Sequence, residues 1–281
     1  MIVENASLKS SIMLIEEHPL RHWINHFFGF GTWQAKVWFV GFEEGGGDLP
    51  EEVADKLNYF YRHHGNASDA TLCDIRDLSR NVAFRIDGPR ADKFNNLYDH
   101  RFAEHAVLHG TWKNLIAFAH GFRNESTPDL RTYQQQQFTK SSEALIKLYP
   151  LPAHNHAWYY SWLDLSEEFA FLKTRSLYEQ HVFSLRIKQI LNCISEYQPE
   201  VVLMYGMNNI NALKSAIQEK FSDVKFKMVK GIKLQVPQHH IADINGTTKL
   251  ILTTQIPALR HNRKETGFDW EALGRSLRSR K

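Results

Sequence analysis

A five-residue apolar run between two helical patterns constrains the fold of this chain more than any other feature. The run from Val201 to Tyr205 holds only apolar, aromatic and β-branched side chains, so we expect a strand buried on both faces. An amphipathic pattern over residues 177–197 precedes it, and Gly206 with a second helical pattern over residues 208–221 follows it. This order of helix, strand, glycine and helix is typical of a parallel sheet covered by helices.

A second strand of this kind leads into the strongest candidate site. Residues 37–40 form a short apolar run that Gly41 ends, and the carboxylates of Glu43 and Glu44 follow at once. The glycines at positions 45–47 then carry no side chain that could cover these acids. Because ligands bind outside the carboxyl ends of the strands in open α/β sheets, we expect a binding site at this loop.

The other segments complete one domain over residues 1–281. We expect helices over residues 11–28, 51–64, 105–122 and 269–278, strands over 144–148 and 250–254, and an added hairpin from 224–228 and 232–236. Residues 124–140 have the polar composition of a loop or a weak helix, and residues 65–100 permit no assignment. Residues 1–35 are expected to form an N-terminal helical layer, and residues 266–281 a basic C-terminal helix.

Composition favours a globular protein and gives no sign of a membrane span. The chain has 281 residues, of which 43% are hydrophobic and 23% charged, and no apolar run approaches the length of about 18 residues that a spanning helix needs. Cys73 and Cys193 belong to no C-x-x-C pair, and the fifteen histidines are scattered without an H-E-x-x-H motif. We therefore expect a cytoplasmic monomer without a metal or other cofactor.

The C-terminal part of the chain is basic, although the net charge is only +3. Arg260, Arg263 and Lys264 follow the last predicted strand, and residues 275–281 add three arginines and a lysine. Cationic side chains that neutralise phosphates supply most non-specific affinity for nucleic acids. We therefore expect duplex or single-stranded DNA as the partner, bound by Arg260, Arg263 and Lys264.

The four predicted strand ends, taken in order, resemble the motifs of the uracil-DNA glycosylase superfamily. Gly41-Phe42-Glu43-Glu44-Gly45 is similar to the Gly-x-[Asp/Asn]-Pro-[Tyr/Gly] motif after the first strand of that superfamily, and Tyr149-Pro150-Leu151 to the loop after its second. The apolar run to Gly206 matches the third strand, and Ile256-Pro257-Ala258 looks like a degenerate form of the His-Pro-Ser segment after the fourth. The style of the motifs is closest to the single-strand-selective and thymine/mismatch-specific branches. The resemblance implies a three-layer αβα fold around a central four-stranded, mainly parallel sheet.

The resemblance also implies a chemistry, in which a base is flipped out of DNA and its N-glycosidic bond is hydrolysed to leave an abasic site. Glu43 lies where the family has the Asp or Asn that positions the attacking water, so we assign it the catalytic role, and Glu44, which replaces the proline, a lesser one. For the donor to the departing base we prefer His261, with His239, His240 and Gln255 as alternatives. The residues expected to bind the substrate are Gly41, Phe42, Glu44, Gly45, Gly46, Tyr149 and Asn155.

Two departures from the family argue against ordinary uracil removal. Lys147 or Ile146 falls where the family has the Asn that reads the edge of uracil, and the glycine loop replaces the bulky aromatic that blocks 5-substituted pyrimidines. More room suits a larger base, so we expect a pyrimidine with a bulky 5-substituent, for example modified cytosine in phage DNA, and a role in antiviral defence or repair. Phe42 is a candidate stacking partner for the flipped base.

Other functions stay open on the sequence alone. One is a catalytically inactive DNA-binding module on the same fold, and another is a conventional uracil or mismatch repair glycosylase. A metal-dependent hydrolase would use Glu43, Glu44 and Asp48, with further acids from residues 74–87, as oxygen ligands for a divalent ion. A nucleotide-binding enzyme ranks last because the chain has neither a G-x-G-x-x-G nor a P-loop pattern.

Overall fold

The computed structural model describes residues 15–46, 49–84, 94–153, 158–232, 235–258 and 267–278. Its strands are β1 (Phe27–Phe30), β2 (Val37–Glu43), β3 (Thr71–Cys73), β4 (Glu143–Tyr149), β5 (Val201–Tyr205), β6 (Lys227–Val229), β7 (His239–Ile244) and β8 (Thr248–Leu252). Its α-helices are α2 (Glu17–His26), α3 (Pro50–His64), α4 (Ile75–Arg80), α5 (Leu97–Arg101), α6 (Trp112–Arg123), α7 (Leu130–Gln136), α8 (Arg175–Tyr197), α9 (Ile210–Lys220) and α10 (Trp270–Leu277). Two 3₁₀ helices, η2 (Tyr159–Trp162) and η3 (Glu167–Lys173), precede α8.

All eight of these strands belong to one sheet, in the order β3-β1-β4-β2-β5-β8-β7-β6. The expected four-stranded sheet is therefore wrong in size. The four strands predicted from apolar runs are neighbours at the centre of the sheet, in the order β4-β2-β5-β8. Every pairing among them is parallel. The strands on either side include antiparallel pairings, β1 with β4, β7 with β8 and β6 with β7. They are short or rich in polar residues, so their periodicity is too weak to predict.

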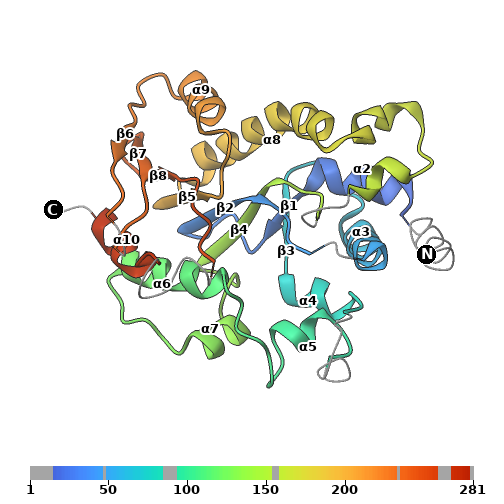
Figure 1. Ribbon diagram of the computed structural model, residues 1–281, viewed down its shortest axis with the longest axis horizontal. Helices are drawn as coiled ribbons and strands as arrows, with labels where there is room; N and C mark the ends of the chain where they lie inside the picture. The colour runs from blue at the N-terminus through green and yellow to red at the C-terminus, as the bar shows by residue number, and fades with distance from the viewer. Residues whose placement is uncertain are drawn as a thin grey trace.

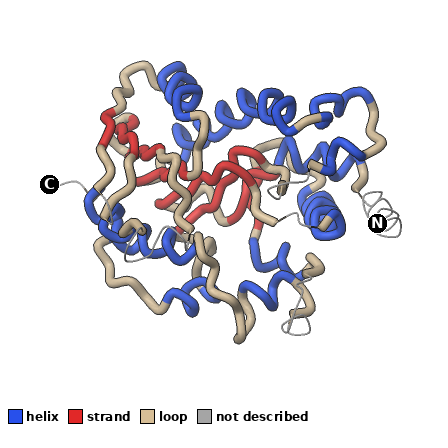
Figure 2. Tube along the Cα trace, viewed as in Figure 1, coloured by secondary structure: helices blue, strands red, loops and turns tan. Residues whose placement is uncertain are grey.

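Helices cover both faces of the sheet. In Figure 1, α2, α8 and α9 lie on one side of the strands, and α4 to α7 with α10 lie on the other. Figure 2 shows the strands enclosed between these helices. The side chains from Val37 to Val40 and from Val201 to Tyr205 are accordingly buried in succession, as parallel strands with two covered faces require. The architecture is that of a mixed α/β protein, and none of the described helices combines the length and apolar character that crossing a membrane demands.

Three expected elements differ in the structure. The N-terminal helix ends at His26, and the next four residues, all buried, form the strand β1 instead of the end of a helical layer. The helix expected from residue 105 starts only at Trp112. The predicted hairpin is also wrong, because residues 227–229 pair with β7, while Ile232 and Val236 make only an isolated bridge to each other. Alternation of apolar and polar residues predicts a strand but not its partner.

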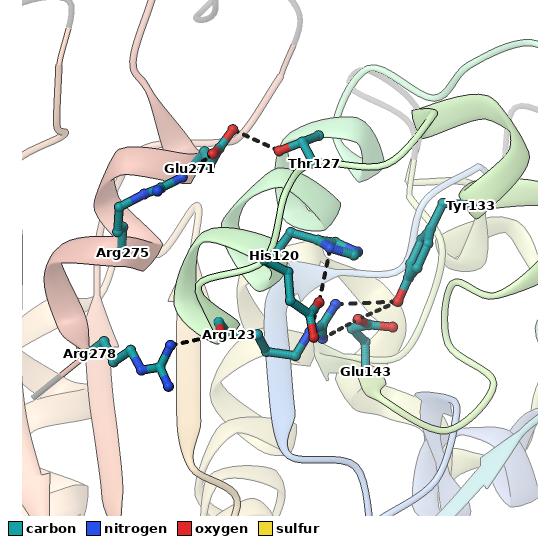
Figure 3. A network of polar contacts seen from close by, with 9 residues as sticks. His120, Arg123, Thr127, Tyr133, Glu143, Glu271, Arg275 and Arg278 are labelled. Carbon is teal, nitrogen blue, oxygen red and sulfur yellow. Dashed lines mark hydrogen bonds and ion pairs between the residues drawn. The ribbon is translucent and has the colours of Figure 1, made fainter.

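A polar network fixes the layer of α6, α7 and α10 at the amino end of β4. Figure 3 shows Arg123 and Tyr133 converging on the fully buried carboxylate of Glu143, with donor–acceptor distances of 2.7 and 2.8 Å. Thr127 donates to Glu271 over 2.7 Å, which ties the loop after α6 to α10. The network lies at the opposite end of β4 from the candidate site described next, so we assign it a role in stability.

Candidate functional site

A pocket of about 430 Å³ lies at the carboxyl ends of the central parallel strands. Glu43 and Glu44 reach it from the end of β2, Lys147 from β4, and Tyr205 from β5. Ile256, in the segment after β8, completes this side of the lining. The four strand ends that carry the sequence motifs therefore meet at one pocket, where open α/β sheets bind their ligands.

The two adjacent carboxylates have different partners. Glu43 forms a hydrogen-bonded ion pair with Arg175 at the start of α8, and its side chain is 26% exposed. Burial raises the pKa of Glu43 above its ordinary value, and Arg175 offsets only part of that rise. Glu44 instead lies 3.3 Å from Lys147 and 3.8 Å from Lys56, with only 7% of its side chain exposed. Glu43 is thus placed at the rim of the pocket and Glu44 in its buried part.

The buried part of the pocket is an ionic cluster built on the first turns of α3. Lys56 lies 3.1 Å from Glu52 and donates to the carbonyl oxygen of Gly45 over 3.0 Å. Gly46 packs directly on this pair with a positive φ of 86°, and a Cβ there would lie 2.5 Å from Glu52 Oε1. Gly45, by contrast, has nothing within 4 Å of the position of a Cβ. Gly45 therefore leaves open space, whereas the positive φ of Gly46 and its contact with the ion pair favour a glycine there.

Lys147 and Leu145 are the residues of β4 that line the pocket, and Lys147 is the charged one. Its Nζ donates to the carbonyl oxygen of Glu43 over 3.4 Å in addition to the ion pair with Glu44. Burial lowers the pKa of Lys147, but Glu44, Tyr205 and Glu43 together more than offset this effect, so the pKa is raised overall. Ile146, the other candidate at the base-reading position, is fully buried in the core and does not line the pocket.

Gly41, which was predicted to bind the substrate, does not line the pocket and instead packs against Tyr205. It pairs with Tyr205 across β2 and β5, and a Cβ at Gly41 would lie 2.9 Å from the Tyr205 hydroxyl oxygen. A glycine is therefore needed for the tyrosine ring to cross the strand. Burial raises the pKa of Tyr205, which keeps its hydroxyl a neutral group in the wall of the pocket.

The other predicted site residues fall into two groups. Phe42 lines the pocket, and its ring lies 4.8 Å from that of Tyr149, centroid to centroid. Tyr149 does not line the pocket, but its carbonyl oxygen accepts a hydrogen bond from the backbone N–H of Glu44 over 3.1 Å and so fixes the loop. The remaining predicted residues lie outside the described part of the chain, and these are Asn155, Arg260, His261, Arg263 and Lys264.

The wall of the pocket opposite the strand ends was not predicted from the sequence. It comes from α4, α5, the start of α6 and residues next to these helices, with Ile75, Leu78, Phe84, Leu97 and Trp112 as its apolar side chains. Arg101 and His109 are its charged or titratable members. His239, His240 and Gln255, the alternatives considered for a donor, do not line the pocket, whereas His109 does. No local sequence pattern marks the residues of this wall. Lys147 within an apolar strand was a signal only for the ionic cluster, because a buried lysine needs an anionic partner.

His109 is held as a neutral imidazole. The backbone N–H groups of Thr111 and Trp112 donate to its Nδ1 over 3.2 and 3.3 Å, so the ring proton is on Nε2. Burial, together with the nearby Arg101, lowers the pKa of His109 well below its ordinary value. The ring also stacks on Trp112, with the centroids 4.4 Å apart. His109 therefore caps α6 and can act as a donor through Nε2, but it is not a base near neutral pH.

Among the described residues, no group of three or more His, Cys, Asp or Glu side chains is arranged to hold a metal ion. Asp74 caps α4 through the backbone N–H groups of Arg76 and Asp77, and Asp77 itself pairs with Arg80. Asp48 and Asp87, two further acids considered as ligands, lie outside the described ranges. Comparison with known proteins finds no family model, no curated protein and no solved structure that matches this chain.

Proposed function

We propose that the chain is a DNA glycosylase that hydrolyses the N-glycosidic bond of a non-canonical base flipped into this pocket. The observation that carries the proposal is the meeting of Glu43, Glu44 and Lys147 in one pocket at the carboxyl ends of four parallel strands. The volume of about 430 Å³ lies within the range of about 300–1,000 Å³ usual for small-ligand sites. The aromatic rings of Phe42, Phe84 and Trp112 line the same space and suit a planar base.

Glu43 is the proposed catalytic carboxylate. Its position at the rim gives it access to water, and Arg175 holds the side chain in one orientation. Cleavage of the N-glycosidic bond leaves positive charge on the sugar, which a carboxylate stabilises while it orients or deprotonates the attacking water. A raised pKa makes Glu43 a stronger base than an exposed glutamate, yet it still ionises when the pH is above that value.

Lys147 and Glu44 are the proposed contacts to the base. The lysine supplies a cationic donor and the glutamate an acceptor, so the pair is complementary to a base edge that has both kinds of group. Negative charge develops on the departing base, and a buried ammonium group at the base-reading position would stabilise it. Lys147 is thus proposed as the donor to the departing base, the role for which His261 was preferred from the sequence.

The space around Gly45 and the wall from α4 to α6 support a base larger than uracil. Nothing lies within 4 Å of the position of a Gly45 Cβ, and the pocket continues along Phe84, Leu97 and Trp112. A pyrimidine with a bulky 5-substituent would occupy this volume, whereas uracil would leave it empty. Modified cytosine, as found in phage DNA, is the proposed substrate class, and defence or repair the proposed role.

The test is a cleavage assay in EDTA on duplex and single-stranded DNA that contains uracil, a thymine mismatch, hydroxymethylcytosine or its glucosylated form. We expect alkali-labile abasic sites at a 5-modified base with the wild type and a loss of at least about 100-fold with Glu43→Gln. Glu179→Gln is the matched control, because Glu179 also contacts Arg175 but does not line the pocket. DNA that is bound but never cleaved would favour the inactive binding module. Equal excision of uracil and the modified bases would favour a conventional repair glycosylase.

A further inference from the structure

The wall of the pocket formed by α4 to α6 contains an arginine, Arg101, that forms no ion pair with any described carboxylate. Arg101, at the end of α5, has no ion pair and no guanidinium hydrogen bond within the described ranges, although burial lowers its pKa to about 10. Its Cζ lies 5.8 Å from the centroid of the Trp112 ring. Arg101 is partly buried. Charged groups that are removed from water are normally paired, so an unpaired one in the wall of a pocket points to a ligand.

Three other buried or partly buried arginines show how this chain satisfies a guanidinium when its role is structural. Arg76 donates to the carbonyl oxygens of Gln134, Gln135 and Phe138, over 3.0 Å in each case. Arg186 likewise donates to three carbonyl oxygens, and Arg123 pairs with Glu143. Arg101 has no comparable set of acceptors among the residues described, and it is the one of these four that lines the pocket.

The other charges of the pocket are already paired. Glu43 pairs with Arg175, Glu44 lies between Lys147 and Lys56, and Glu52 pairs with Lys56. Glu52 forms no ion pair with Arg101 and acts on it only as a nearby charge, which raises the pKa of Arg101 against the larger effect of burial. The ionic cluster therefore leaves Arg101 available to a negative group that the ligand itself brings.

The surroundings of Arg101 offer donors and are held in place. His109 presents Nε2–H, because its Nδ1 is occupied by two backbone N–H groups. Gln134, which is fully buried, donates to the carbonyl oxygens of Arg101 and Val107 and accepts from the backbone N–H of His109. One side chain from α7 thus fixes both residues of this wall before any ligand arrives, and the start of α6 adds the positive end of a helix dipole.

We propose that Arg101 and His109 bind a negatively charged substituent, a carboxylate or a phosphate, on the ring that enters the pocket. The inference rests on the proposed function for the identity of that ring as a base, and it narrows the substrate from a bulky 5-modified pyrimidine to an anionic one. A planar guanidinium binds either group with two parallel hydrogen bonds, and the stacked His109 and Trp112 rings extend the surface on which the base would lie.

The experiment measures equilibrium binding of free bases to the full chain by calorimetry, so it does not depend on catalysis. The probes are 5-carboxyuracil, 5-phosphomethyluracil and the neutral thymine, and the proteins are the wild type, Arg101→Gln, Arg101→Lys and the control Arg80→Gln. Arg80 pairs with Asp77 on the surface of α4 and does not line the pocket. We expect at least about tenfold tighter binding of one anionic base than of thymine, as charge-assisted hydrogen bonds give. Preference for the carboxylate or for the phosphate identifies which anion is bound.

Arg101→Gln should remove this preference, Arg101→Lys should keep part of it, and Arg80→Gln should keep all of it. Equal affinity of the wild type for charged and neutral bases would overturn the inference, and so would an unchanged preference in Arg101→Gln. If Arg101→Gln does not fold, the same comparison is made with Arg101→Lys, where an undiminished preference would count against bidentate binding. Excision of a neutral base without any anion preference would refute only this inference, whereas anion binding without excision of any base would refute only the glycosylase activity.

Discussion

The ion pair between Glu44 and Lys147 makes the most demanding prediction about the pocket. Both side chains are more than nine-tenths buried and lie 3.3 Å apart. Removal of one partner from a buried pair costs about 3–5 kcal/mol, because the other charge is left without compensation. Lys56 remains 3.8 Å from Glu44 when Lys147 is replaced, so we expect Lys147→Met to reduce the free energy of unfolding by about 3 kcal/mol, at the lower end of that range. Glu44→Leu, which strands Lys147, should have a similar effect.

The double variant distinguishes a coupled pair from two independent contributions. Independent losses would add to about 6 kcal/mol, but contacting residues usually show coupling energies of about 0.5–3 kcal/mol. We expect a coupling of about 2–3 kcal/mol, so that Lys147→Met with Glu44→Leu costs about 3–4 kcal/mol in all. Urea unfolding followed by both fluorescence and circular dichroism measures these values, and the two signals must coincide for the comparison to be valid. Additivity within about 0.5 kcal/mol would refute the assignment of a direct buried pair.

Three further predictions concern other contacts in and around the pocket. Because Arg175 lowers the pKa of Glu43, Arg175→Gln should raise that pKa further, and the acid limb of the excision rate should move to higher pH, which a pH–rate profile measures. Gly41→Ala should cost about 1–3 kcal/mol in urea unfolding, since its Cβ would meet the Tyr205 hydroxyl, and the same change should cost less in a Tyr205→Phe background. Gln134→Ala should lose at least about 2 kcal/mol, because three backbone groups would lose a buried partner, and hydrogen exchange should rise first in residues 101–109.

The sequence predicted the centre of the fold well because strong local patterns specify it. Short apolar runs, one of them interrupted by Lys147, predicted all four central strands, and amphipathic patterns predicted α3, α8 and α9 to within a few residues. The outer strands escaped prediction for a physical reason. Residues 27–30 and 71–73 are too short to show a period, and the first of them contains Gly29, whose φ of 135° lets it approach the backbone of Leu145 closely. Such strands are stabilised by pairing with distant segments, which no local pattern records.

The candidate site was predicted where it depends on one strand end and missed where it depends on long-range packing. Phe42 and Glu43 line the pocket because they end the buried strand β2, and Glu44 lines it because it directly follows that strand. Arg101 and His109 belong to segments with weak or no periodicity, and they reach the pocket through contacts with a helix some 30 residues further along the chain. The glutamine run at residues 134–137, interpreted as a loop or a weak helix, supplies the buried side chain that orders this wall.

Two charged residues that interrupt apolar patterns connect the packing of the fold with the position of the pocket. Lys147 interrupts the run of β4, and Arg186 interrupts the buried face of α8. Arg186 is fully buried and donates to the carbonyl oxygens of Phe27, Lys147 and Leu148, so it joins α8 to the carboxyl end of β4 and to the start of β1. The antiparallel pairing of β1 with β4 involves only residues 29 and 30 of β1. Next to this short ladder, the Arg186 guanidinium supplies the hydrogen bonds that further strand pairing would have given to the carbonyl groups. A cation placed to satisfy the backbone therefore fixes the strand position from which Lys147 reaches the pocket. The same reasoning separates Arg186, whose guanidinium donates to three carbonyl oxygens of the fold, from Arg101, for which the described residues supply no acceptor.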